Sequence, residues 1–287
     1  MPSMRIPQSE LPVAVFDSGV GGLTVLHECL VSLPHEDFLY LGDTARFPYG
    51  MRSADQLLGF ALELSDILLE RGAKLLVVAC NSATAAALPA LRERLAGRVA
   101  VVGVVEPESR LAAAATRNGR VGLIATPATV ASGAYDRALE EASASGAELH
   151  AVAAPELAPL IQAGGEVDGT VACVERACEP LLEAGVDTVI LGCTHYPLVR
   201  PVLQRTLGRG VQIVSSGEAI AVEVESELAG SGLAAPPHRR GQYGFLASGD
   251  PEQFRRLGTR FLQLPIARVG HVQVSRPTEP AGAEAMA

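Results

Sequence analysis

The chain lacks any long apolar run. No stretch of about 20 consecutive apolar residues occurs, which is the length a helix needs to cross a bilayer. The first twelve residues contain no apolar segment of the kind found in secretion signals. Hydrophobic residues nevertheless make up 48% of the chain and charged residues 19%. These proportions are typical of a globular protein, and we expect it to reside in the cytoplasm without a membrane partner.

Positive charge is also scarce. Lys74 is the only lysine, and the net charge is −9. Arginines do not cluster with interleaved aromatic residues, as they do in many nucleic-acid-binding proteins, so we expect no nucleic acid partner. The glycine-rich segment Ser18–Gly22 does not match the dinucleotide-binding fingerprint, because Thr24 stands where that pattern needs glycine. The segment therefore favours no nucleotide site.

Cysteines are few and irregularly spaced. The count is odd, and no pair has the C-x-x-C spacing of a zinc site or a redox motif. This pattern predicts reduced thiols in a reducing compartment and no metal site. The five residues are Cys29, Cys80, Cys173, Cys178 and Cys193.

The chain does contain many short apolar segments separated by longer helical patterns. Ala54–Glu70 is one such helix, and Ser53 with Gln56 forms a capping-box signature at its start. The alternation predicts an α/β fold whose parallel strands are covered on both faces. The expected strands are Val13–Phe16, Phe38–Leu41, Leu75–Ala79, Ala100–Val104, Val121–Ile124, Leu149–Val152, Thr188–Leu191, Val211–Val214 and Tyr243–Leu246.

Two segments of the sequence resemble each other and suggest an internal repeat. Leu75–Ser82 and Thr188–His195 each read as a buried strand, a small residue, a cysteine and then polar residues that open a helix. A length of 287 residues suits two domains at roughly 100–200 residues each. We expect residues 1–100 plus 211–275 to form the first α/β domain and residues 101–210 the second, followed by a disordered tail over 276–287.

Polar turns follow several of these strands. In open α/β sheets, ligands bind beyond the carboxyl ends of the strands. We therefore expect a site built from the turns that follow the first and third strands of each half, together with the segment Gly42–Gly50. These turns are Asp17-Ser18-Gly19, Cys80-Asn81-Ser82, Thr126–Thr129 and Cys193-Thr194-His195.

Cys80 and Cys193 are the leading candidates for chemistry. At a helix N-terminus, unpaired N–H groups lower the pKa of a thiol and favour the thiolate. The alternative is that each is a small buried residue, as most free cysteines are. Two cysteines in matching polar contexts favour the functional interpretation, whereas the other three lie within helical patterns. Asp17 alone reads as a turn residue, and His195 reads either as a packing residue or as a group that tunes the second thiol.

At this point the sequence resembles the bacterial glutamate racemase family. The resemblance extends from about residue 13 to 262 and is most specific at Gly192–Leu198. The residues that carry it are Asp17–Leu23, Gly42–Gly50, Ala79–Asn81, Gly192–Leu198 and Ser248–Phe254.

The resemblance implies two similar, doubly wound α/β domains with the active site in the cleft between them. It implies racemisation of L- and D-glutamate with no pyridoxal phosphate, metal or nucleotide as cofactor. Cys80 would act on the α-proton of the D isomer and Cys193 on that of the L isomer, a case of general acid–base catalysis. Asp17 would support Cys80, and His195 would support Cys193. The substrate-binding residues would be Asp17, Ser18, Tyr49, Gly50, Asn81, Ser82, Thr129, Thr194 and His195.

The resemblance further implies supply of D-glutamate for peptidoglycan, and we expect a homodimer. The chain departs from the family pattern at a few positions. Ser82 replaces the usual threonine, and Gln162 stands where the family often carries an auxiliary glutamate. Glu108 stands where glycine is common, and Ser215 where aspartate is common. The last two departures have no explanation at the level of sequence.

Three other functions fit parts of the pattern. The same fold could racemise aspartate, although Gly192–Pro197 favours glutamate. A binding protein with structural cysteines is the second alternative, and the retention of both Cys80 and Cys193 argues against it. A cysteine hydrolase is the third, but it needs a Cys-His-Asn or Cys-His-Asp relay. The spacing of two residues between Cys193 and His195 gives poor geometry for such a relay.

Overall fold

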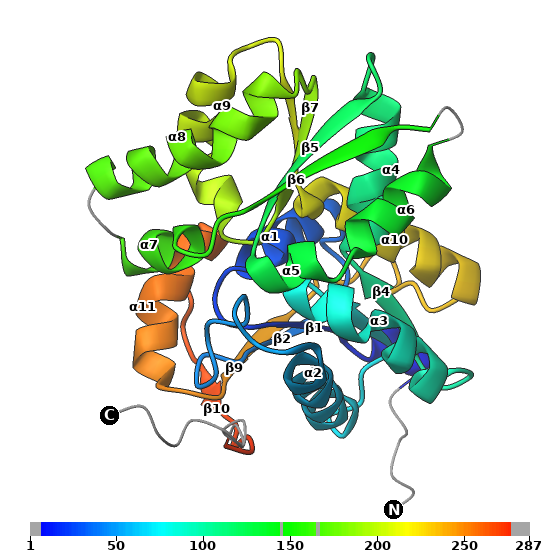
Figure 1. The fold of residues 1–287 in the computed structure, drawn as a ribbon. Helices are drawn as coiled ribbons and strands as arrows, with labels where there is room; N and C mark the ends of the chain where they lie inside the picture. Colours follow the sequence, from blue (N-terminus) through cyan, green and yellow to red (C-terminus); the bar gives the residue numbers. More distant parts are fainter. Residues whose placement is uncertain (1–6, 144–145, 165–166, 277–287) are drawn as a thin grey trace, which may run out of the picture.

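A computed structural model describes residues 7–143, 146–164 and 167–276. These residues form two parallel-sheet α/β domains, as expected (Figure 1). One sheet has six strands in the order β10-β9-β2-β1-β3-β4, and the other has four in the order β6-β5-β7-β8. The strands are β1 Val13–Asp17, β2 Phe38–Gly42, β3 Leu75–Val78, β4 Ala100–Gly103, β5 Arg120–Ala125, β6 Glu148–Ala153, β7 Thr188–Gly192, β8 Gln212–Val214, β9 Tyr243–Ala247 and β10 Gly270–His271.

The two sheets repeat one topology. The order β2-β1-β3-β4 in the first sheet corresponds to β6-β5-β7-β8 in the second, and every strand pair is parallel. In each, the first strand in sequence lies between the second and the third. This arrangement confirms that the two halves are similar. It also places the turns after β1 and β3, and those after β5 and β7, on neighbouring strands.

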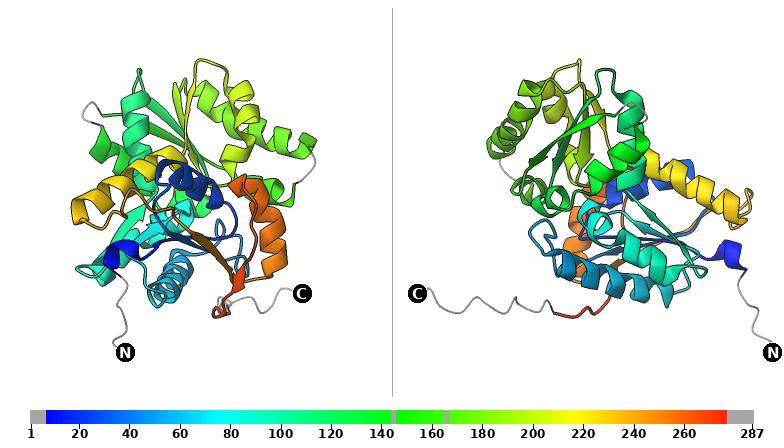
Figure 2. Two further views of the ribbon diagram at one scale, coloured as in Figure 1. Left: turned by 180° about the vertical axis from the view of Figure 1, so that it is seen from behind. Right: turned by 45° about the vertical axis from the view of Figure 1, so that its right-hand side comes forward.

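Helices cover both faces of each sheet (Figures 1 and 2). In the first domain α2 packs with α3, while α1 packs with α10 and α11. In the second, α8 packs with α7 and α9, while α4 packs with α6. The helices are α1 Leu23–Ser32, α2 Ala54–Leu69, α3 Asn81–Leu95, α4 Val105–Ala115, α5 Pro127–Ala131, α6 Ala134–Ala142, α7 Leu157–Ala163, α8 Val167–Glu183, α9 Arg200–Leu207, α10 Ser216–Ser231 and α11 Pro251–Leu262, with 3-10 turns η1 Gln8–Glu10 and η2 Tyr196–Val199.

Strand β1 shows why the apolar segments are continuous. Val13 and Val15 pack into one hydrophobic cluster, whereas Ala14 and Phe16 pack into another on the opposite face. Because both faces are buried, Val13–Phe16 are all apolar, and the strand ends at the polar residue Asp17. The start of α2 is also as expected, since Ser53 and Gln56 form a complete capping box.

The strands assign a few residues differently from the expected domain division at 100/101 and 210/211. Val101–Gly103 pair with β3 in the first sheet, and Gln212–Val214 pair with β7 in the second. Each boundary therefore lies after its strand, because backbone pairing holds these residues in the sheet of the preceding domain. Strand β10 was not expected, since two residues carry no apolar pattern. Residues 277–287 of the expected tail lie outside the described residues.

A buried ion pair lies at the amino ends of β2 and β3. Nζ of Lys74 lies 2.5 Å from a carboxylate oxygen of Glu36, and both side chains are almost fully buried. The same ammonium donates to the backbone carbonyls of Ser9 and Leu233. Three acceptors thus satisfy the three hydrogens of the ammonium group.

None of the described helices is long and apolar enough to cross a membrane.

Candidate active site

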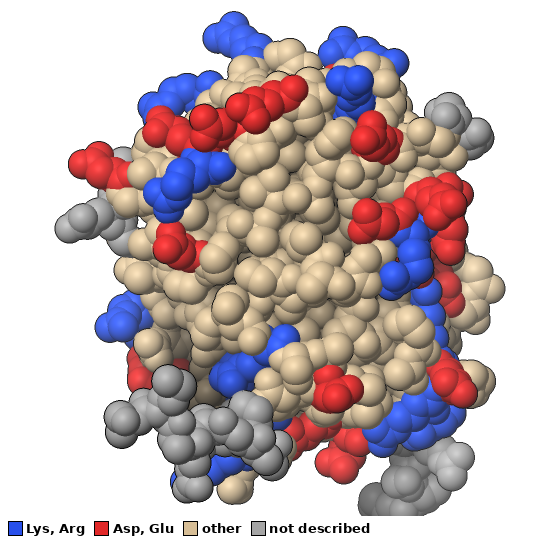
Figure 3. Space-filling model, in the orientation of Figure 1, with Lys and Arg blue, Asp and Glu red and all other residues tan. Residues whose placement is uncertain are grey.

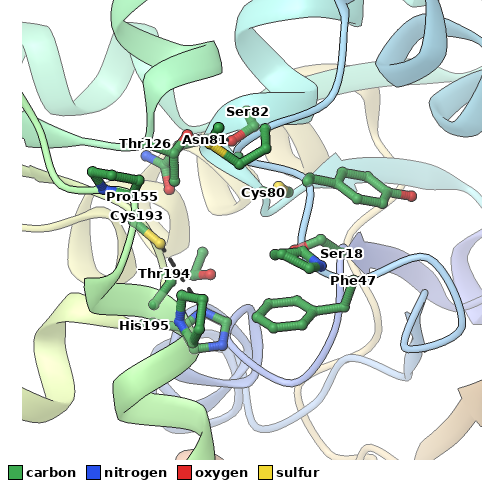
Figure 4. A pocket seen from close by; sticks show the side chains of 16 residues that line it. Ser18, Phe47, Cys80, Asn81, Ser82, Thr126, Pro155, Cys193, Thr194 and His195 are labelled. Carbon is green, nitrogen blue, oxygen red and sulfur yellow. Dashed lines mark hydrogen bonds between the residues drawn. The ribbon is translucent and has the colours of Figure 1, made fainter. Parts of the chain in front are cut away.

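A pocket lies where the carboxyl ends of the central strands of both sheets meet. Cys80 follows β3 of the first sheet, and Cys193 follows β7 of the second. Figure 4 shows their sulfur atoms on opposite sides of the pocket. The lining residues are Ser18, Phe47, Pro48, Tyr49, Gly50, Met51, Cys80, Asn81, Ser82, Thr126, Pro155, Ala158, Pro159, Cys193, Thr194 and His195.

Cys80 is the N-cap residue of α3, as its sequence context predicts. The expectation of a lowered thiol pKa is wrong for Cys80. Burial, reinforced by the nearby Asp17 carboxylate, raises the pKa of Cys80 to about 12. The N–H of Ala83 and both polar groups of Ser18 oppose this rise but do not overcome it. The rise in the pKa of Cys80 caused by removal from water therefore exceeds the lowering caused by the N-terminus of α3.

Cys193 differs from Cys80 in its local structure. It precedes the short 3-10 turn η2 and caps no α-helix, so the expected helix start is absent there. Burial raises the pKa of its thiol, and the backbone N–H of His195 acts in the opposite direction. Coulombic repulsion from Cys80, Asp17 and Glu108 in their ionised forms adds to the rise. Both thiols are thus held in the protonated form.

His195 lies beside the second thiol, as expected. Its Nδ1 is 4.0 Å from Sγ of Cys193, and its Nε2 is 3.0 Å from Oε1 of Gln162. The ring packs between the aromatic rings of Phe47 and Phe261. Burial, with a smaller effect from the charge of Arg260, lowers the pKa of His195 to about 3. The imidazole is therefore neutral at physiological pH.

Asp17 lies beneath the pocket wall and is not among the lining residues. Its carboxylate accepts a hydrogen bond from the backbone N–H of Gly19 at 3.0 Å and another from the Thr194 hydroxyl at 3.4 Å. The second bond joins the first sheet to the loop after β7. Burial raises the pKa of Asp17. The residue supports the turns beside both cysteines and raises the pKa of Cys80 through its charge.

The turn after β1 packs tightly against the loop that carries Cys193. A Cβ atom at Gly21 would lie 2.3 Å from Oγ1 of Thr194 and 2.4 Å from Nδ1 of His195. Contacts this short are incompatible with any side chain. Only glycine lets the two loops approach closely enough to place Thr194 and His195 at the pocket.

Tyr49 and Gly50 line the pocket from the segment after β2. The Tyr49 hydroxyl donates to the buried carboxylate of Asp43, so it points away from a bound substrate. Asp43 also accepts from Nε of Arg46 and from the Ser248 hydroxyl, both at 2.6 Å. These hydrogen bonds to Asp43 hold the loop after β2 in place. The loop therefore contributes the main chain of Tyr49 and Gly50, and not the Tyr49 hydroxyl, to the pocket.

A hydroxyl cluster forms the wall beside Cys80. The Ser82 hydroxyl lies 2.9 Å from that of Thr126 and 3.1 Å from that of Thr129. The two threonine hydroxyls lie 3.0 Å apart. Thr126, which lies in an expected site turn but was not among the expected substrate-binding residues, lines the pocket, whereas Thr129 lies behind it. Thr126 directly follows β5 and is the N-cap residue of α5. This position at the carboxyl end of a strand is the sequence signal that identifies it as a pocket residue.

The two ends of the Asn81 side-chain amide differ in their hydrogen bonding. Its Nδ2 donates to a carboxylate oxygen of Glu108 at 3.1 Å and to the Tyr135 hydroxyl at 2.7 Å. Among the described residues, its Oδ1 has no hydrogen-bond partner although it is buried. The pocket therefore contains one carbonyl oxygen that still needs a donor.

The structure brings together most of the expected site residues. Nine of them line the pocket, while Asp17 and Thr129 support it from behind. The apolar lining was missed, because Phe47, Pro155 and Ala158 carry no polar signal in the sequence. Over the part of the chain that is described, no group of three or more His, Cys, Asp or Glu side chains could hold a metal ion. On the face shown in Figure 3, the Lys and Arg side chains lie among Asp and Glu around the rim and form no continuous basic surface.

Comparison with known proteins gives a consistent result. Residues 25–224 match the family model described as Asp/Glu/Hydantoin racemase. A glutamate racemase from Beutenbergia cavernae is 46% identical over 271 residues, covering 88% of this chain and 90% of the relative. A glutamate racemase from Bacillus anthracis superposes with a TM-score of 0.85 at 35% identity, covering 94% and 100% of the two chains. A glutamate racemase from Francisella tularensis in complex with D-glutamate gives 0.84 at 28% identity, covering 92% and 98%. The chain therefore belongs to the Asp/Glu/hydantoin racemase family, within its glutamate racemase branch.

Proposed function

We propose that the enzyme interconverts L- and D-glutamate by moving the α-proton between Cys80 and Cys193. The observation that carries this proposal is the placement of two buried thiols, one from each sheet, on opposite sides of one pocket. A substrate carbon between them would present one face to each sulfur. The similar structure from Francisella tularensis holds D-glutamate, which supports glutamate as the ligand.

The raised thiol pKa values suggest how the site is activated. None of the described residues that line the pocket carries a positive charge to offset a thiolate, since none is Lys or Arg and His195 is neutral. The substrate brings its own ammonium group into this dry environment, where opposite charges attract strongly. That charge favours release of one thiol proton to the solvent as the substrate binds. The bound state then holds one thiolate and one thiol, which is the pair that racemisation requires.

The reaction conserves charge and protons. The thiolate removes the α-proton from one face of the substrate and becomes a thiol. The electron pair left on the α-carbon spreads into the carboxylate. The opposite thiol donates its proton to the other face and becomes a thiolate. Cys193 acts as the base on L-glutamate, and Cys80 acts as the base on D-glutamate.

Neutral donors would hold the two carboxylates. The first N–H groups of α3, at Asn81 and Ser82, lack partners within the helix. The loops at Tyr49-Gly50 and Thr194 add backbone N–H groups from the other sides. Such preoriented donors stabilise charge that develops on the α-carboxylate during proton removal. The Ser18 and Ser82 hydroxyls can donate as well, with Thr129 supporting Ser82.

The test is incubation in D₂O with L-glutamate and no added cofactor. We expect optical rotation to decay while the NMR signal of the α-proton disappears. Loss of rotation without deuterium at the α-carbon would contradict proton exchange. If aspartate racemises and glutamate does not, the proposed substrate is wrong. Release of ammonia would point instead to hydrolytic chemistry.

We also propose that the product supplies D-glutamate for peptidoglycan and that the enzyme works in the cytoplasm. The support for the location is chemical. All five cysteines are free and buried, which suits a reducing compartment. A strain depleted of the enzyme should require added D-glutamate to maintain its wall, and growth without it would contradict this role.

We further propose a homodimer. Leu111 of α4 and Val222 of α10 expose 42% and 61% of their surface, and both line one groove. Exposed apolar side chains that gather in one place are typical of interaction surfaces. Sedimentation analysis should give twice the mass of 29.9 kDa, and the mass of a single chain would refute the dimer.

A further inference from the structure

Glu108 is a buried carboxyl group that the proposed reaction does not use. It lies in α4, its side chain is fully buried, and it does not line the pocket. We propose that Glu108 is a positioning residue that orients the Asn81 side-chain amide so that its carbonyl oxygen receives the substrate's ammonium group. This inference rests on the function proposed above.

The argument begins with the donors of Asn81. A side-chain amide has two N–H donors on its nitrogen and an acceptor on its oxygen. One N–H bonds to Oε2 of Glu108, and the other bonds to Oη of Tyr135. The Tyr135 hydroxyl donates to the same oxygen of Glu108, which leaves Oη free to accept from Asn81. The three groups form a closed triangle in which each donor has an acceptor.

This triangle allows only one orientation of the amide. Oε2 of Glu108 accepts from both Asn81 and Tyr135, so the proton of the neutral carboxyl group lies on Oε1. If the amide turned over, Oδ1 of Asn81 would face this unprotonated oxygen, and two acceptors would meet without a hydrogen between them. Burial makes such an unsatisfied contact costly. The carboxyl group therefore directs Nδ2 away from the pocket and leaves Oδ1 as the free end.

The free end defines the ligand group that it can bind. Oδ1 is buried and has no partner among the described residues. As an acceptor, it needs an N–H or O–H donor from the ligand. At neutral pH, both carboxylates of glutamate are acceptors, so its only donor is the ammonium group. Asn81 thus recognises the feature that separates an amino acid from a simple dicarboxylate.

The three members of the triangle come from three helices. Asn81 begins α3, Glu108 lies in α4, and Tyr135 lies in α6. Helices α4 and α6 pack closely together, and both contact α3. Because α4 and α6 belong to the second domain, the carboxyl group holds a first-domain binding residue from the far side of the cleft. Precise contact across this boundary would be lost if Glu108 were shortened.

The test compares two ligands of equal length. D-Glutamate carries the ammonium group, and glutarate has both carboxylates without it. We expect Glu108→Ala to raise the KM for glutamate by about tenfold or more, the usual effect of losing orientation in a hydrogen bond to a charged group. The inhibition constant of glutarate should change less than about twofold, and kcat should fall much less than KM rises.

Three matched variants complete the experiment. Glu108→Gln keeps an acceptor oxygen of the same reach, so KM should return to within about threefold of the unmodified enzyme. Glu106→Ala makes the same change on a half-exposed residue of the same helix and should leave KM unchanged. Tyr135→Phe removes one acceptor at nearly constant volume and should raise KM for glutamate alone, which keeps the proposal testable if Glu108→Ala does not fold.

The results separate this inference from the proposed function. If the unmodified protein racemises glutamate but Glu108→Ala leaves its KM unchanged, the positioning role is refuted. Equal weakening of glutamate and glutarate also refutes it, because it would mean general damage to the pocket. Absence of racemisation in the unmodified protein would instead refute the proposed function.

Discussion

Nε2 of His195 lies 3.0 Å from the side-chain oxygen of Gln162. An amide oxygen only accepts hydrogen bonds, so this contact places the ring hydrogen on Nε2. The opposite nitrogen, Nδ1, is then a bare acceptor that faces the Cys193 sulfur. A neutral amide thus selects a neutral imidazole tautomer that can accept a hydrogen bond from the second thiol.

Replacing Gln162 by glutamate should change the charge of His195. A carboxylate at the same distance stabilises the imidazolium, so the pKa of His195 should rise from about 3 towards its ordinary value of 6.5 or above it. NMR titration of the ring protons measures this directly. Gln162→Leu removes the acceptor without adding charge and should leave the imidazole neutral. An unchanged pKa in Gln162→Glu would show that the two side chains do not interact.

Substitution of either pocket cysteine should abolish racemisation. Cys80→Ala or Cys193→Ala removes a group that must both accept and donate the α-proton, whereas the folded state should lose only about 1 kcal/mol, the centre of the range for single substitutions. Polarimetry and urea unfolding measure the two effects. Cys178→Ala is the control, since this residue is fully buried but remote from the pocket lining. Full activity in Cys80→Ala or Cys193→Ala would refute the two-thiol mechanism.

Gly21→Ala should damage the site through packing alone. The added methyl group would displace Thr194 and His195, because the available space is 2.3–2.6 Å. We expect kcat/KM to fall by about a hundredfold, in line with the effect of small misplacements of catalytic groups. Gly59→Ala is the matched control: nothing lies within 4 Å of its Cβ position, and alanine favours the helix by up to about 1 kcal/mol. Normal activity in Gly21→Ala would mean that the loop at Thr194 can move without cost.

The pH dependence of stability should reveal the buried carboxyl group of Glu108. Burial raises its pKa from 4.5 to about 8, while Asn81, Tyr135 and Ser216 act in the opposite direction. Between these values the folded protein keeps a proton that the unfolded chain releases. The free energy of unfolding therefore falls as pH rises through this window, by up to about 1.4 kcal/mol per pH unit.

Glu108→Gln cannot titrate at this position. Comparing the variant with the unmodified protein therefore isolates the contribution of Glu108 from those of all other groups. The difference in unfolding free energy between Glu108→Gln and the unmodified protein should grow in favour of the variant from about pH 4.5 to 8 and then level off. Urea unfolding at several pH values gives the difference. If it stays constant across the window, Glu108 is ionised throughout in the folded state.

The sequence predicted most of the framework because strands buried on both faces leave continuous apolar segments between helical patterns. The order of the strands within each sheet was not predicted. Cys80 and Cys193 were identifiable because both follow a buried strand and precede polar residues. Their protonation was not predictable, since desolvation depends on the residues that close the pocket from other segments. The positions of Glu108 and Gln162 were noted only as departures from a family pattern. Their contacts with Asn81 and His195 arise from helix packing over 27 and 33 residues of sequence.

The burial of Lys74 at the amino end of β3 has a practical consequence for chemical labelling. The only ε-amino group of the chain is held by Glu36 and two backbone carbonyls, and its side chain is 1% exposed. Acylating dyes, amine cross-linkers and coupling resins therefore find no lysine on the folded surface. The amine becomes reactive only when this edge of the sheet opens. The rate of acylation at Lys74 therefore measures how often that local unfolding occurs.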